Sequence, residues 1–422
     1  DTKPIAFDKK GNMYIPFGAP SDCCQVSEGA PFSPGKDPCP LLETRGGIWK
    51  FDAGKPNQFQ QDGELFAGGF RSIVAIAWNN ADDHLYTIMH GRDYLHWNWP
   101  MYYTELEGAI LPSEEFFRIK KGDNAGWPYA YWDHLKNKKM QAPEYGGNGR
   151  MEAKDSSYLK PIVSFPGHFA PNDLLFYTGN QFPERYRNGA FIAFHGSTSS
   201  APYPQAGYFI AFVPFTNGQP SGAWEVFADG FAGRDTIYNT SDAKYRPMGL
   251  SQGPDGSLYV SETEKGKIWR VMFKGDREKF GAPALAAMDK RKAEAPNTKM
   301  PDELKDNLDR KDYSPAARTY NTYCGKCHER NGEGNNRFPP LKGSEWFAGD
   351  IQQPLHIVLN GMEVEMMVRG RRFINTMPAF ANVLTDEQLA DVLTYVKTEF
   401  NGAASGVSVQ EVRKARKELF KK

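Results

Sequence analysis

The five consecutive residues Cys324, Gly325, Lys326, Cys327 and His328 constrain this chain more than any other stretch. Two cysteines separated by two residues and followed at once by a histidine form the attachment signature of a c-type haem. Cysteines three positions apart on one helical turn present both sulfurs to the two vinyl edges of one porphyrin, and the adjacent imidazole then reaches the iron. The C-terminal part is therefore predicted to be a small all-α cytochrome c domain.

Two other kinds of site use a CxxC pair, namely zinc sites and thioredoxin-like redox pairs. A zinc site needs a second pair of ligands, and the sequence has no other CxxC and no HxxxH. A redox pair should follow a strand, and it gives no reason for the adjacent histidine. We therefore interpret Cys324 and Cys327 as the thioether cysteines of haem c and His328 as an iron ligand.

The second iron ligand is expected later in the chain, and Met377 is the residue that we predict. The proline at position 378 keeps the chain extended, which lets the thioether reach the haem face and raises the haem potential relative to a second imidazole. The alternatives are three methionines and one histidine: Met362, Met366, Met367 and His356. We expect these methionines to pack in apolar surroundings, and the histidine to lie partly buried on a helix over residues 352–360.

The bulk properties exclude several classes of function. The 422 residues carry 51 basic and 51 acidic side chains, so charge gives no reason to expect a nucleic-acid partner. No apolar run approaches the ~20 residues of a membrane-spanning helix. The chain begins at Asp1, which fits a removed signal peptide or a truncated sequence. Since haem c attachment implies export in bacteria, we expect a periplasmic or otherwise exported protein.

Three further cysteines lie near the N-terminus: Cys23, Cys24 and Cys39. In an oxidising compartment we expect one disulfide, which would join Cys24 to Cys39 and close the loop between them. Cys23 would then be the cysteine without a disulfide partner. A strained bridge between Cys23 and Cys24 is the alternative, because spacing alone does not fix the connectivity.

Residues 4–273 read as short strands joined by turns, with abundant glycine, proline and aromatic residues. A typical unit runs from Met248 to Val260 through an Asp-Gly turn, and a strand at 266–271 follows it. Sheet-like units of several dozen residues that recur in this way predict about four blades of a β-propeller. A β-sandwich or an irregular all-β domain is the alternative.

The chain is therefore predicted to be multidomain β + α. A β-propeller domain is expected over residues 1–275, a charged and partly helical linker over 276–312, and the cytochrome c domain over 313–422. Ser314, Thr385 and Ser408 are expected to cap the helices that follow them.

A set of short motifs runs in order through the β region. These are Gly18-Ala-Pro20, Asp37-Pro-Cys-Pro40, Glu43-Thr-Arg-Gly-Gly-Ile-Trp49, His90-Gly-Arg-Asp93, Gly126-Trp-Pro128, Ala170-Pro-Asn-Asp-Leu174, Ala193-Phe-His-Gly196, Phe227-Ala-Asp-Gly230 and Tyr245-Arg-Pro247. With them the region closely resembles the pyrroloquinoline quinone (PQQ)-dependent sugar dehydrogenases of the glucose/sorbosone dehydrogenase family. The resemblance implies a six-bladed propeller with PQQ and Ca²⁺ on its axis. The C-terminal part resembles the class I cytochromes c fused to such enzymes.

The resemblance also assigns roles to particular residues. The family's arginine beside quinone and substrate falls on Arg71, and the backbone carbonyls that hold calcium fall near Gly91 and Arg92. The basic pair that faces the quinone carboxylates falls on Lys244 and Arg246, and two cations suit a tricarboxylate. His195 stands where the family has a quinone-facing lysine. Taken singly, the basic residues would read as solvated surface charges and His195 as a core histidine.

The chain departs from the family in its first part. The family's general base is a histidine just before the strand that begins here at Ile5, and two blades precede that strand. A fragment, a partner that supplies the sector, or a propeller without catalysis would each explain this, and we expect a fragment or an incomplete chain. Asp1 and Asp22 are not obvious replacements for the base.

The sequence thus predicts an oxidoreductase that oxidises an aldose or a related alcohol or aldehyde through PQQ. Its electrons would pass through haem c to an external acceptor such as a cytochrome, a copper protein or an oxidase. The alternatives are an electron-transfer module whose propeller binds a partner or a saccharide without catalysis, and a haem sensor with an exchangeable sixth ligand.

Overall fold

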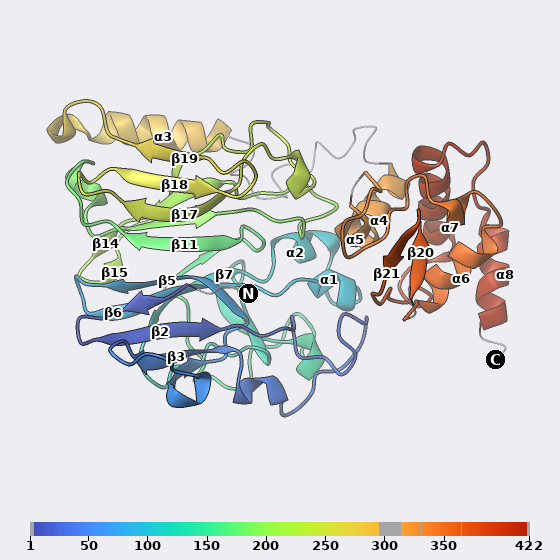
Figure 1. Cartoon of the computed structure of the whole chain (residues 1–422), viewed down its shortest axis with the longest axis horizontal. Helices are drawn as coiled ribbons and strands as arrows, with labels where there is room; N and C mark the ends of the chain where they lie inside the picture. Colours follow the sequence, from blue (N-terminus) through green and yellow to red (C-terminus); the bar gives the residue numbers. More distant parts are fainter. Residues whose placement is uncertain (1–3, 295–313, 330, 364, 420–422) are drawn as a thin grey trace. The chain divides into compact units, whose positions relative to one another are not determined.

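A computed structural model describes residues 4–294, 314–329, 331–363 and 365–419. The chain divides into two compact units. The first comprises Asp1–Glu28, Phe32–Ser200 and Pro204–Leu304, and the second comprises Gly29–Pro31, Ala201–Tyr203 and Lys305–Lys422. The first unit is built mainly of strands and the second mainly of helices (Figure 1). The predicted order of a mainly-β region followed by a helical region is confirmed, whereas the exact domain boundaries stay a prediction.

Four larger antiparallel sheets lie within the described part of the first unit. In strand order, the first contains β1 (Ala6–Phe7), β2 (Asn12–Phe17), β3 (Gly47–Asp52) and β4 (Glu64–Gly68). The second contains β10 (Val163–Phe165), β7 (Glu114–Ile119), β6 (His84–His90) and β5 (Ser72–Asn79). The third contains β11 (Pro171–Phe176), β12 (Ala190–Phe194), β13 (Phe209–Val213) and β16 (Glu225–Ala228). The fourth contains β17 (Pro247–Gln252), β18 (Leu258–Glu262) and β19 (Ile268–Val271).

Short hairpins and helices fill the connections of this unit. They are β8 (Ala130–Asp133) with β9 (Lys138–Gln141), β14 (Phe215–Thr216) with β15 (Gln219–Pro220), α1 (Leu95–Asn98), α2 (Glu105–Ile110) and α3 (Ala282–Glu294). Helix α3 packs against β16, where Lys292 Nζ lies 3.9 Å from the ring centroid of Trp224. This helix falls within the predicted linker, whose residues 295–312 lie outside the described residues.

The predicted Asp-Gly hairpin between β17 and β18 is confirmed. Gly253 donates its N–H to the Ser257 carbonyl at 2.8 Å, and Asp255 accepts from the Ser257 N–H at 3.1 Å. Gly256 has φ +79°, and a Cβ there would lie 3.0 Å from the backbone nitrogen of Gln181. The turn therefore needs glycine both for its left-handed backbone and for the close approach of the neighbouring chain.

The four sheets pack face to face, because the alternation of side chains along each strand gives a central sheet two apolar faces. On β12 the side chains of Ile192 and Phe194 join the core shared with the second sheet, and those of Phe191 and Ala193 join the core shared with the fourth. The innermost strands β5, β11 and β17 contact one another in the order of their sheets (Figure 1). This arrangement fits blades around a centre, while the closed six-bladed ring stays a prediction.

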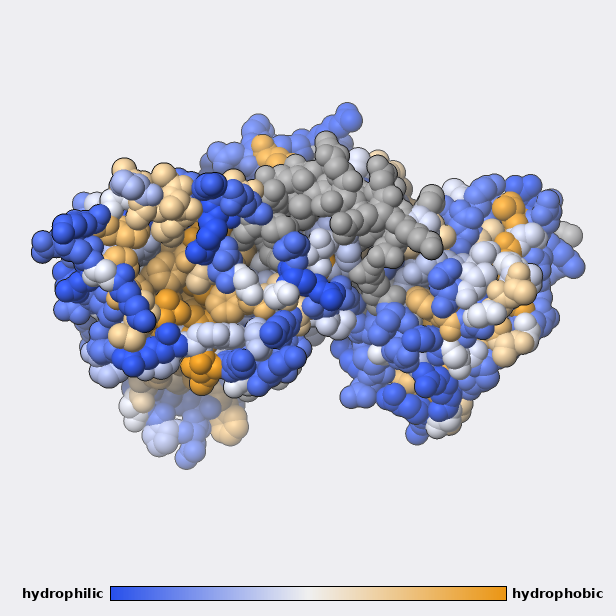
Figure 2. Space-filling view, turned by 90° about the horizontal axis from the view of Figure 1, so that it is seen from above, coloured by the Kyte–Doolittle hydropathy of each residue, from blue (hydrophilic) through white to orange (hydrophobic). Residues whose placement is uncertain are grey.

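The outer side of the fourth sheet is mixed in character. Strand β19 and helix α3 lie at the top of the first unit in Figure 1 and face the viewer in Figure 2, where hydrophobic side chains gather beside hydrophilic ones. Ile268 on β19 is 69% exposed and Arg270 is also exposed, whereas Trp269 and Val271 point inward to the core. The sheet therefore presents both apolar and charged groups on this side.

The second unit contains five α-helices in its described residues. These are α4 (Pro315–Tyr323), α5 (Gly325–His328), α6 (Gln352–Asn360), α7 (Asp386–Tyr395), which continues as a π-helical turn over Val396–Phe400, and α8 (Val409–Leu419). All three predicted caps are confirmed: Ser314 accepts from Ala317 N–H, Thr385 from Gln388 N–H and Ser408 from Glu411 N–H. No helix in the described residues is long and apolar enough to cross a bilayer.

The prediction that this unit is all-α is wrong in one place. Strands β20 (Met366–Val368) and β21 (Arg371–Phe373) form an antiparallel hairpin. Its two-residue turn is Arg369-Gly370, and both residues have positive φ, at 49° and 70°. Such turns match the right-handed twist of the flanking strands, and glycine at the second position favours them.

Candidate functional site

The residues assigned by resemblance in the β unit lie at one edge of the sheets. Arg71 comes directly before β5, His90 ends β6, His195 follows β12 and Arg246 directly precedes β17. In antiparallel sheets the start of one strand lies beside the end of its neighbour. Hydrogen bonds cross between the sheets here, from His90 Nε2 to the Pro171 carbonyl (2.8 Å) and from Arg246 Nη2 to the Gly196 carbonyl (2.7 Å). We call this edge, with residues 71, 90–93, 195–196 and 244–246, the site edge.

Arg71 is held by two carboxylates and a carbonyl. Its Nη2 lies 2.6 Å from Asp22 Oδ1 and 3.3 Å from Asp93 Oδ2, and its Nη1 donates to the Gly91 carbonyl. Burial disfavours the charged guanidinium, but the two carboxylates outweigh this effect and raise the pKa of Arg71. Arg71 is therefore a permanent cation fixed at the start of β5.

Arg92 points its side chain into the protein. Its Nη1 donates to Glu144 Oε2 at 2.5 Å, and Glu144 Oε1 accepts from the Trp99 indole N–H at 2.7 Å. Both charged side chains are almost fully buried, and Nη2 of Arg92 has no hydrogen-bond partner among the described residues. The side chain of Arg92 thus has a structural role, which leaves only its backbone carbonyl for the predicted calcium contact.

His195 and Arg246 form the second half of the site edge. Arg246 donates from Nε to the His195 carbonyl at 3.2 Å, and its Nη1 lies 3.6 Å from Glu264 Oε1. The His195 ring contacts Thr263 Oγ1 through Nε2 at 2.9 Å. Burial, and then the charge of Arg246, lower the pKa of His195 to about 3. His195 is therefore a neutral polar group at physiological pH.

Lys244 is not joined to this network in the same way. It is exposed, and its Nζ lies 5.5 Å from the ring centroid of Tyr245. Lys267 lies over the same ring at 4.9 Å. The predicted basic pair is thus split into a half-buried Arg246 and a solvent-facing Lys244.

Sequence reasoning missed a carboxylate and imidazole layer behind Arg71. Asp93 Oδ1 lies 3.1 Å from His168 Nδ1, and Glu114 accepts from the backbone N–H groups of Gly91 (2.9 Å) and Ala170 (3.1 Å). Burial raises the pKa of Glu114 to about 7. The His90–Asp93 motif was the one sequence signal for this layer, because it contains Asp93 and Gly91.

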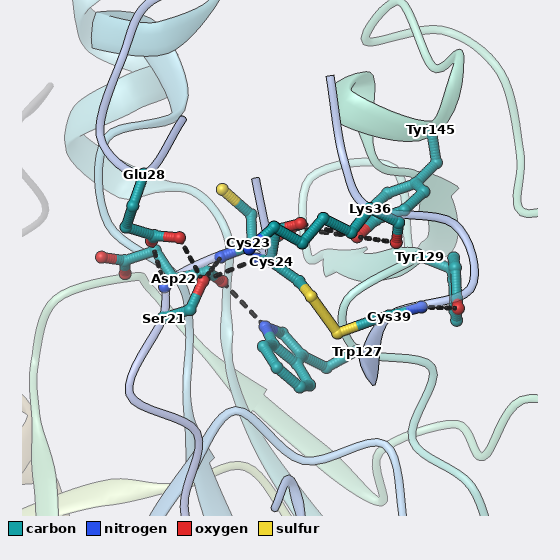
Figure 3. Close-up of a disulfide and its surroundings, with 10 residues drawn as sticks. All are labelled: Ser21, Asp22, Cys23, Cys24, Glu28, Lys36, Cys39, Trp127, Tyr129 and Tyr145. Atoms are coloured by element: carbon teal, nitrogen blue, oxygen red, sulfur yellow. Dashed lines mark hydrogen bonds between the residues drawn. A yellow bond between two sulfur atoms is a disulfide. The ribbon is translucent and has the colours of Figure 1, made fainter. Parts of the chain in front are cut away.

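The predicted disulfide between Cys24 and Cys39 is present, and Cys23 is a buried free thiol. Figure 3 shows that the same loop carries Asp22 between Glu28 and Trp127. The Asp22 N–H donates to Glu28 Oε1 at 3.1 Å, and its carbonyl accepts from Trp127 Nε1–H at 2.8 Å. The loop therefore brings Asp22 onto Arg71 from 49 positions earlier in the chain.

The residues near Gly91 do not fit calcium as they stand. The Gly91 carbonyl accepts from the Arg71 guanidinium, so a cation already lies on this oxygen. In the described residues, no group of three or more His, Cys, Asp or Glu side chains is placed to hold a metal ion. The Gly91 and Arg92 carbonyls stay a prediction, and we derive no step through calcium.

The site edge fits an anionic quinone better. Arg246 directs two of its donor groups to backbone carbonyls and has one carboxylate, Glu264, at 3.6 Å from Nη1. A guanidinium held in this way meets carboxylates as a pre-oriented cation. Lys244 adds an exposed positive charge two residues away.

In the helical unit the CxxCH motif lies on the short helix α5 (Gly325–His328). Cys324 directly precedes α5, Cys327 lies within it, and His328 is buried at its end. His328 Nδ1 pairs with the Pro339 carbonyl at 2.8 Å, which leaves Nε2 as the nitrogen for a metal. Burial lowers the pKa of His328, so the ring is in the neutral form that binds iron.

Met377 is half-buried and pairs with Met362 through both backbone hydrogen bonds, at 2.9 and 2.8 Å. Gly361 has φ +73°, and a Cβ there would lie 2.6 Å from the Met377 carbonyl. Glycine therefore allows the two segments to approach. The expectation that the alternative methionines all pack is wrong for Met367, which is 51% exposed because β20 alternates and turns it outward. His356 lies half-buried on α6, as predicted.

Comparison with models of known families finds one match in each of the two units. The TrAA12-like family model matches residues 46–274, which is more than half of the 422 residues. The chain belongs to the TrAA12-like family. The family model for the cbb3-type cytochrome c oxidase subunit III matches residues 311–396. The predicted resemblance is confirmed: a domain like the PQQ-dependent sugar dehydrogenases precedes a cytochrome c domain.

Individual relatives of this TrAA12-like protein match parts of it. A PQQ-dependent pyranose dehydrogenase of Coprinopsis cinerea is 26% identical over 251 residues, which cover 50% of this chain and 31% of the relative. A gluconate 2-dehydrogenase cytochrome c subunit of Pantoea cypripedii is 33% identical over 113 residues, which cover 25% of each chain. The calcium structure of the Trichoderma reesei Carbohydrate-Active Enzymes Family AA12 protein has a TM-score of 0.48 and 18% identity, with 63% of this chain and 67% of that chain covered. The chain spans at most about half the length of the curated relatives it matches.

Proposed function

We propose that this chain is a quinohaemoprotein oxidoreductase that oxidises an aldose or a related alcohol or aldehyde through PQQ and passes the electrons to a covalently bound haem c. One observation carries the proposal. Arg71, His195 and Arg246 lie at the same edge of the sheets in a TrAA12-like domain whose chain continues into a cytochrome c domain. The relative that is a PQQ-dependent pyranose dehydrogenase supports a sugar as the substrate class.

Each residue of the site edge has a distinct role in this proposal. PQQ, when bound, supplies the two-electron oxidant. Arg246 and the exposed Lys244 would attract its carboxylates. His195 is neutral, so it offers a polar contact without adding a charge to the site edge. Arg71, a fixed cation, would lie beside the quinone and would favour negative charge there.

The helical unit takes the electrons onward. Cys324 and Cys327 would hold the haem covalently, His328 would bind the iron through Nε2, and Met377 would supply the second protein ligand. The gluconate 2-dehydrogenase relative, a cytochrome c subunit, supports electron transfer by this unit. An external acceptor protein receives the electrons, and haem attachment makes a periplasmic or otherwise exported location the one we propose.

One observation favours a second function. Asp22 and Asp93 already neutralise Arg71, and the Gly91 carbonyl already has a cationic donor. A propeller with such a satisfied centre would serve as a binding platform for a partner or a saccharide, joined to an electron-transferring cytochrome c domain.

Haem reduction in the purified holoprotein distinguishes these two functions. We would add PQQ, with and without Ca²⁺, then a panel of aldoses and alcohols, and follow the visible absorption of the haem. Reduction that needs both PQQ and substrate supports the oxidoreductase. A haem that dithionite reduces but that no substrate and PQQ combination reduces would favour the binding platform.

A further inference from the structure

The β20–β21 hairpin lies directly before the predicted iron ligand Met377, because β21 ends at Phe373. Within the helical unit it lies on the side away from α8 (Figure 1). We propose that the exposed surface formed by this hairpin and the loop 335–338 is the place where an external electron acceptor with an acidic surface docks. The inference rests on the haem c of the proposed function and adds the chemistry of the protein partner.

The hairpin and the loop are each attached to one of the two predicted iron ligands. The loop runs into Pro339, whose carbonyl pairs with Nδ1 of His328 at 2.8 Å. The hairpin runs into Met377, whose backbone pairs with that of Met362 at 2.9 and 2.8 Å. A surface built from both segments therefore lies beside any haem that His328 and Met377 hold.

The two segments are also bonded to each other. Arg371 donates from Nη2 to Asn336 Oδ1 at 3.2 Å, and the Asn375 side-chain amide donates to the Arg337 carbonyl. These bonds bring the side chains of residues 337, 371 and 374 onto one surface, which we call the hairpin patch. Since the segments are tied at two points, the patch is a pre-formed surface, which lowers the ordering cost of docking.

The hairpin patch carries two arginines without a carboxylate partner in the described part of the chain. The neighbouring arginines differ in this respect: Arg369 pairs with Glu333 at 3.1 Å and Arg372 with Glu365 at 2.6 Å. Arg337 and Arg371 are exposed, and they lie over the rings of Phe338 and Phe373 at 5.5 and 5.4 Å from the ring centroids. Two cations that their own unit leaves without counter-charge fit carboxylates on a partner.

An exposed apolar residue lies beside these two cations. Ile374 is 64% exposed, although Phe373 directly before it is buried. Covering such a side chain removes apolar surface from water, and arginine is the cation that protein interfaces favour. An apolar group with flanking arginines is therefore the arrangement of a protein-docking surface.

The size of the hairpin patch fits a transient encounter. Electron-transfer partners bury less than about 1,200 Å², and they must separate after each transfer. In each encounter one electron passes from the reduced haem to the acceptor, which is reduced by one electron, and no bond forms or breaks. Opposite charges raise the rate of such encounters, and salt screens this effect.

The test uses copper(II) plastocyanin, a small electron acceptor with an acidic face, as the probe. The holoprotein is first reduced with dithionite and freed of excess reductant, and haem oxidation is followed by stopped flow. The wild-type rate should fall as the salt concentration rises. In the double variant Arg337→Gln/Arg371→Gln the rate at low salt should fall about tenfold, the lower range for loss of electrostatic steering, and most of the salt dependence should disappear.

A binding measurement without electron transfer accompanies the kinetics. With both proteins oxidised, NMR titration should give a dissociation constant about fivefold higher for the double variant than for wild type. Ile374→Gln should also weaken binding, by about threefold, but should leave the salt dependence unchanged because it removes no charge.

Three controls separate docking from other effects. Lys414→Gln/Lys417→Gln removes two exposed cations from α8, which is attached to neither predicted ligand, and it should react like wild type. Arg337→Lys/Arg371→Lys keeps both charges and should recover most of the rate. The cationic oxidant tris(phenanthroline)cobalt(III) should oxidise the double glutamine variant at least as fast as wild type. Thermal unfolding of each variant shows whether it is folded.

Four outcomes overturn the inference in different ways. A double glutamine variant within twofold of the wild-type rate means that the acceptor docks elsewhere, and the proposed function stands. Equal slowing with plastocyanin and with the cobalt complex assigns the two arginines to the haem itself. If the variant slows substrate-dependent haem reduction but not oxidation, the hairpin patch receives electrons and does not deliver them. A wild type without covalent haem overturns both the inference and the proposed function.

Discussion

The two units of this chain assemble their sites in opposite ways. In the helical unit, two thiols and an imidazole come from the five consecutive residues 324–328, and one turn of helix sets their spacing. In the β unit, the site edge draws on strand ends from residue 71 to residue 246, together with Asp22 from a disulfide-bonded loop. A local site depends on covalent geometry, whereas a dispersed one depends on the packing of whole sheets. The two units should therefore fail in different ways when single residues are changed.

The largest effect is expected at the local site. Replacing both Cys324 and Cys327 by serine should abolish covalent haem attachment, because no other described thiol lies beside His328. Haem staining after denaturing electrophoresis checks this. Cys23→Ser is the matched control and should keep its haem, since that thiol belongs to the β unit. Haem that survives the double replacement would contradict the assignment.

The next effect concerns the sixth ligand. Met377→His should lower the haem reduction potential by on the order of 100 mV or more, because an imidazole replaces a thioether on the iron. Redox titration of the haem absorption measures the shift. Met362→Leu, at the neighbouring backbone partner of Met377, should change the potential little. If the Met362 variant shifts instead, the ligand assignment moves to that residue.

At the dispersed site a buried partner should affect folding before chemistry. Glu144→Gln leaves the Arg92 guanidinium buried without its counter-charge and should lower the free energy of unfolding of the β unit by about 3–5 kcal/mol. Denaturant unfolding followed by tryptophan fluorescence measures it. The matched control is Glu152→Gln, whose partner Lys138 is 52% exposed, and it should cost less than about 1 kcal/mol. Equal losses in the two variants would mean that burial of the ion pair is unimportant.

The smallest effect is a pH dependence in the helical unit. Burial opposes ionisation of Asp386, but hydrogen bonds from Arg416 (2.7 Å) and Arg413 (3.2 Å) outweigh it and lower the pKa of Asp386 below its ordinary value of 3.8. The stabilisation is therefore complete above pH 3.8 and is lost as the pH falls through the lowered pKa. Asp386→Asn should cost about 1 kcal/mol at pH 7.

This difference between Asp386→Asn and wild type should shrink on acidification, as measured by the thermal midpoint of the helical unit. Asp391→Asn, at an exposed position of the same helix, provides the control and should leave the midpoint unchanged at every pH. A loss from Asp386→Asn that is independent of pH would contradict the electrostatic explanation.

Local features of both units could be predicted from the sequence. The helix caps at Ser314, Thr385 and Ser408 depend on side chains within three residues of their partners, so spacing alone indicates them. The Asp-Gly turn at Asp255-Gly256 is local in the same sense, whereas the Cys24–Cys39 bridge was one of two pairings that the sequence left open. The β20–β21 hairpin was missed although Arg369-Gly370 is a two-residue turn signal, because its strands have only three residues each.

The electrostatics of the site edge could not be predicted in this way. The contact between Asp22 and Arg71 requires a loop to lie across the end of a neighbouring sheet. The alternation of apolar and polar residues along the sequence does not predict such a long-range contact. The same holds for the buried pair of Arg92 and Glu144, which joins positions 52 residues apart. The resemblance to a family selected Arg71 and Arg246, but it gave no information on which groups neutralise them.

The concentration of the functional groups at one edge has a practical consequence at the other. The turns that join β1 to β2, β5 to β6 and β17 to β18, over residues 8–11, 80–83 and 253–257, lie at the opposite ends of the same strands. These hairpin tips carry exposed polar side chains such as Lys9, Asn80 and Asp255. They are positions at which an affinity tag, a fluorophore or a linker to an electrode could be attached at a distance from the site edge within the β unit.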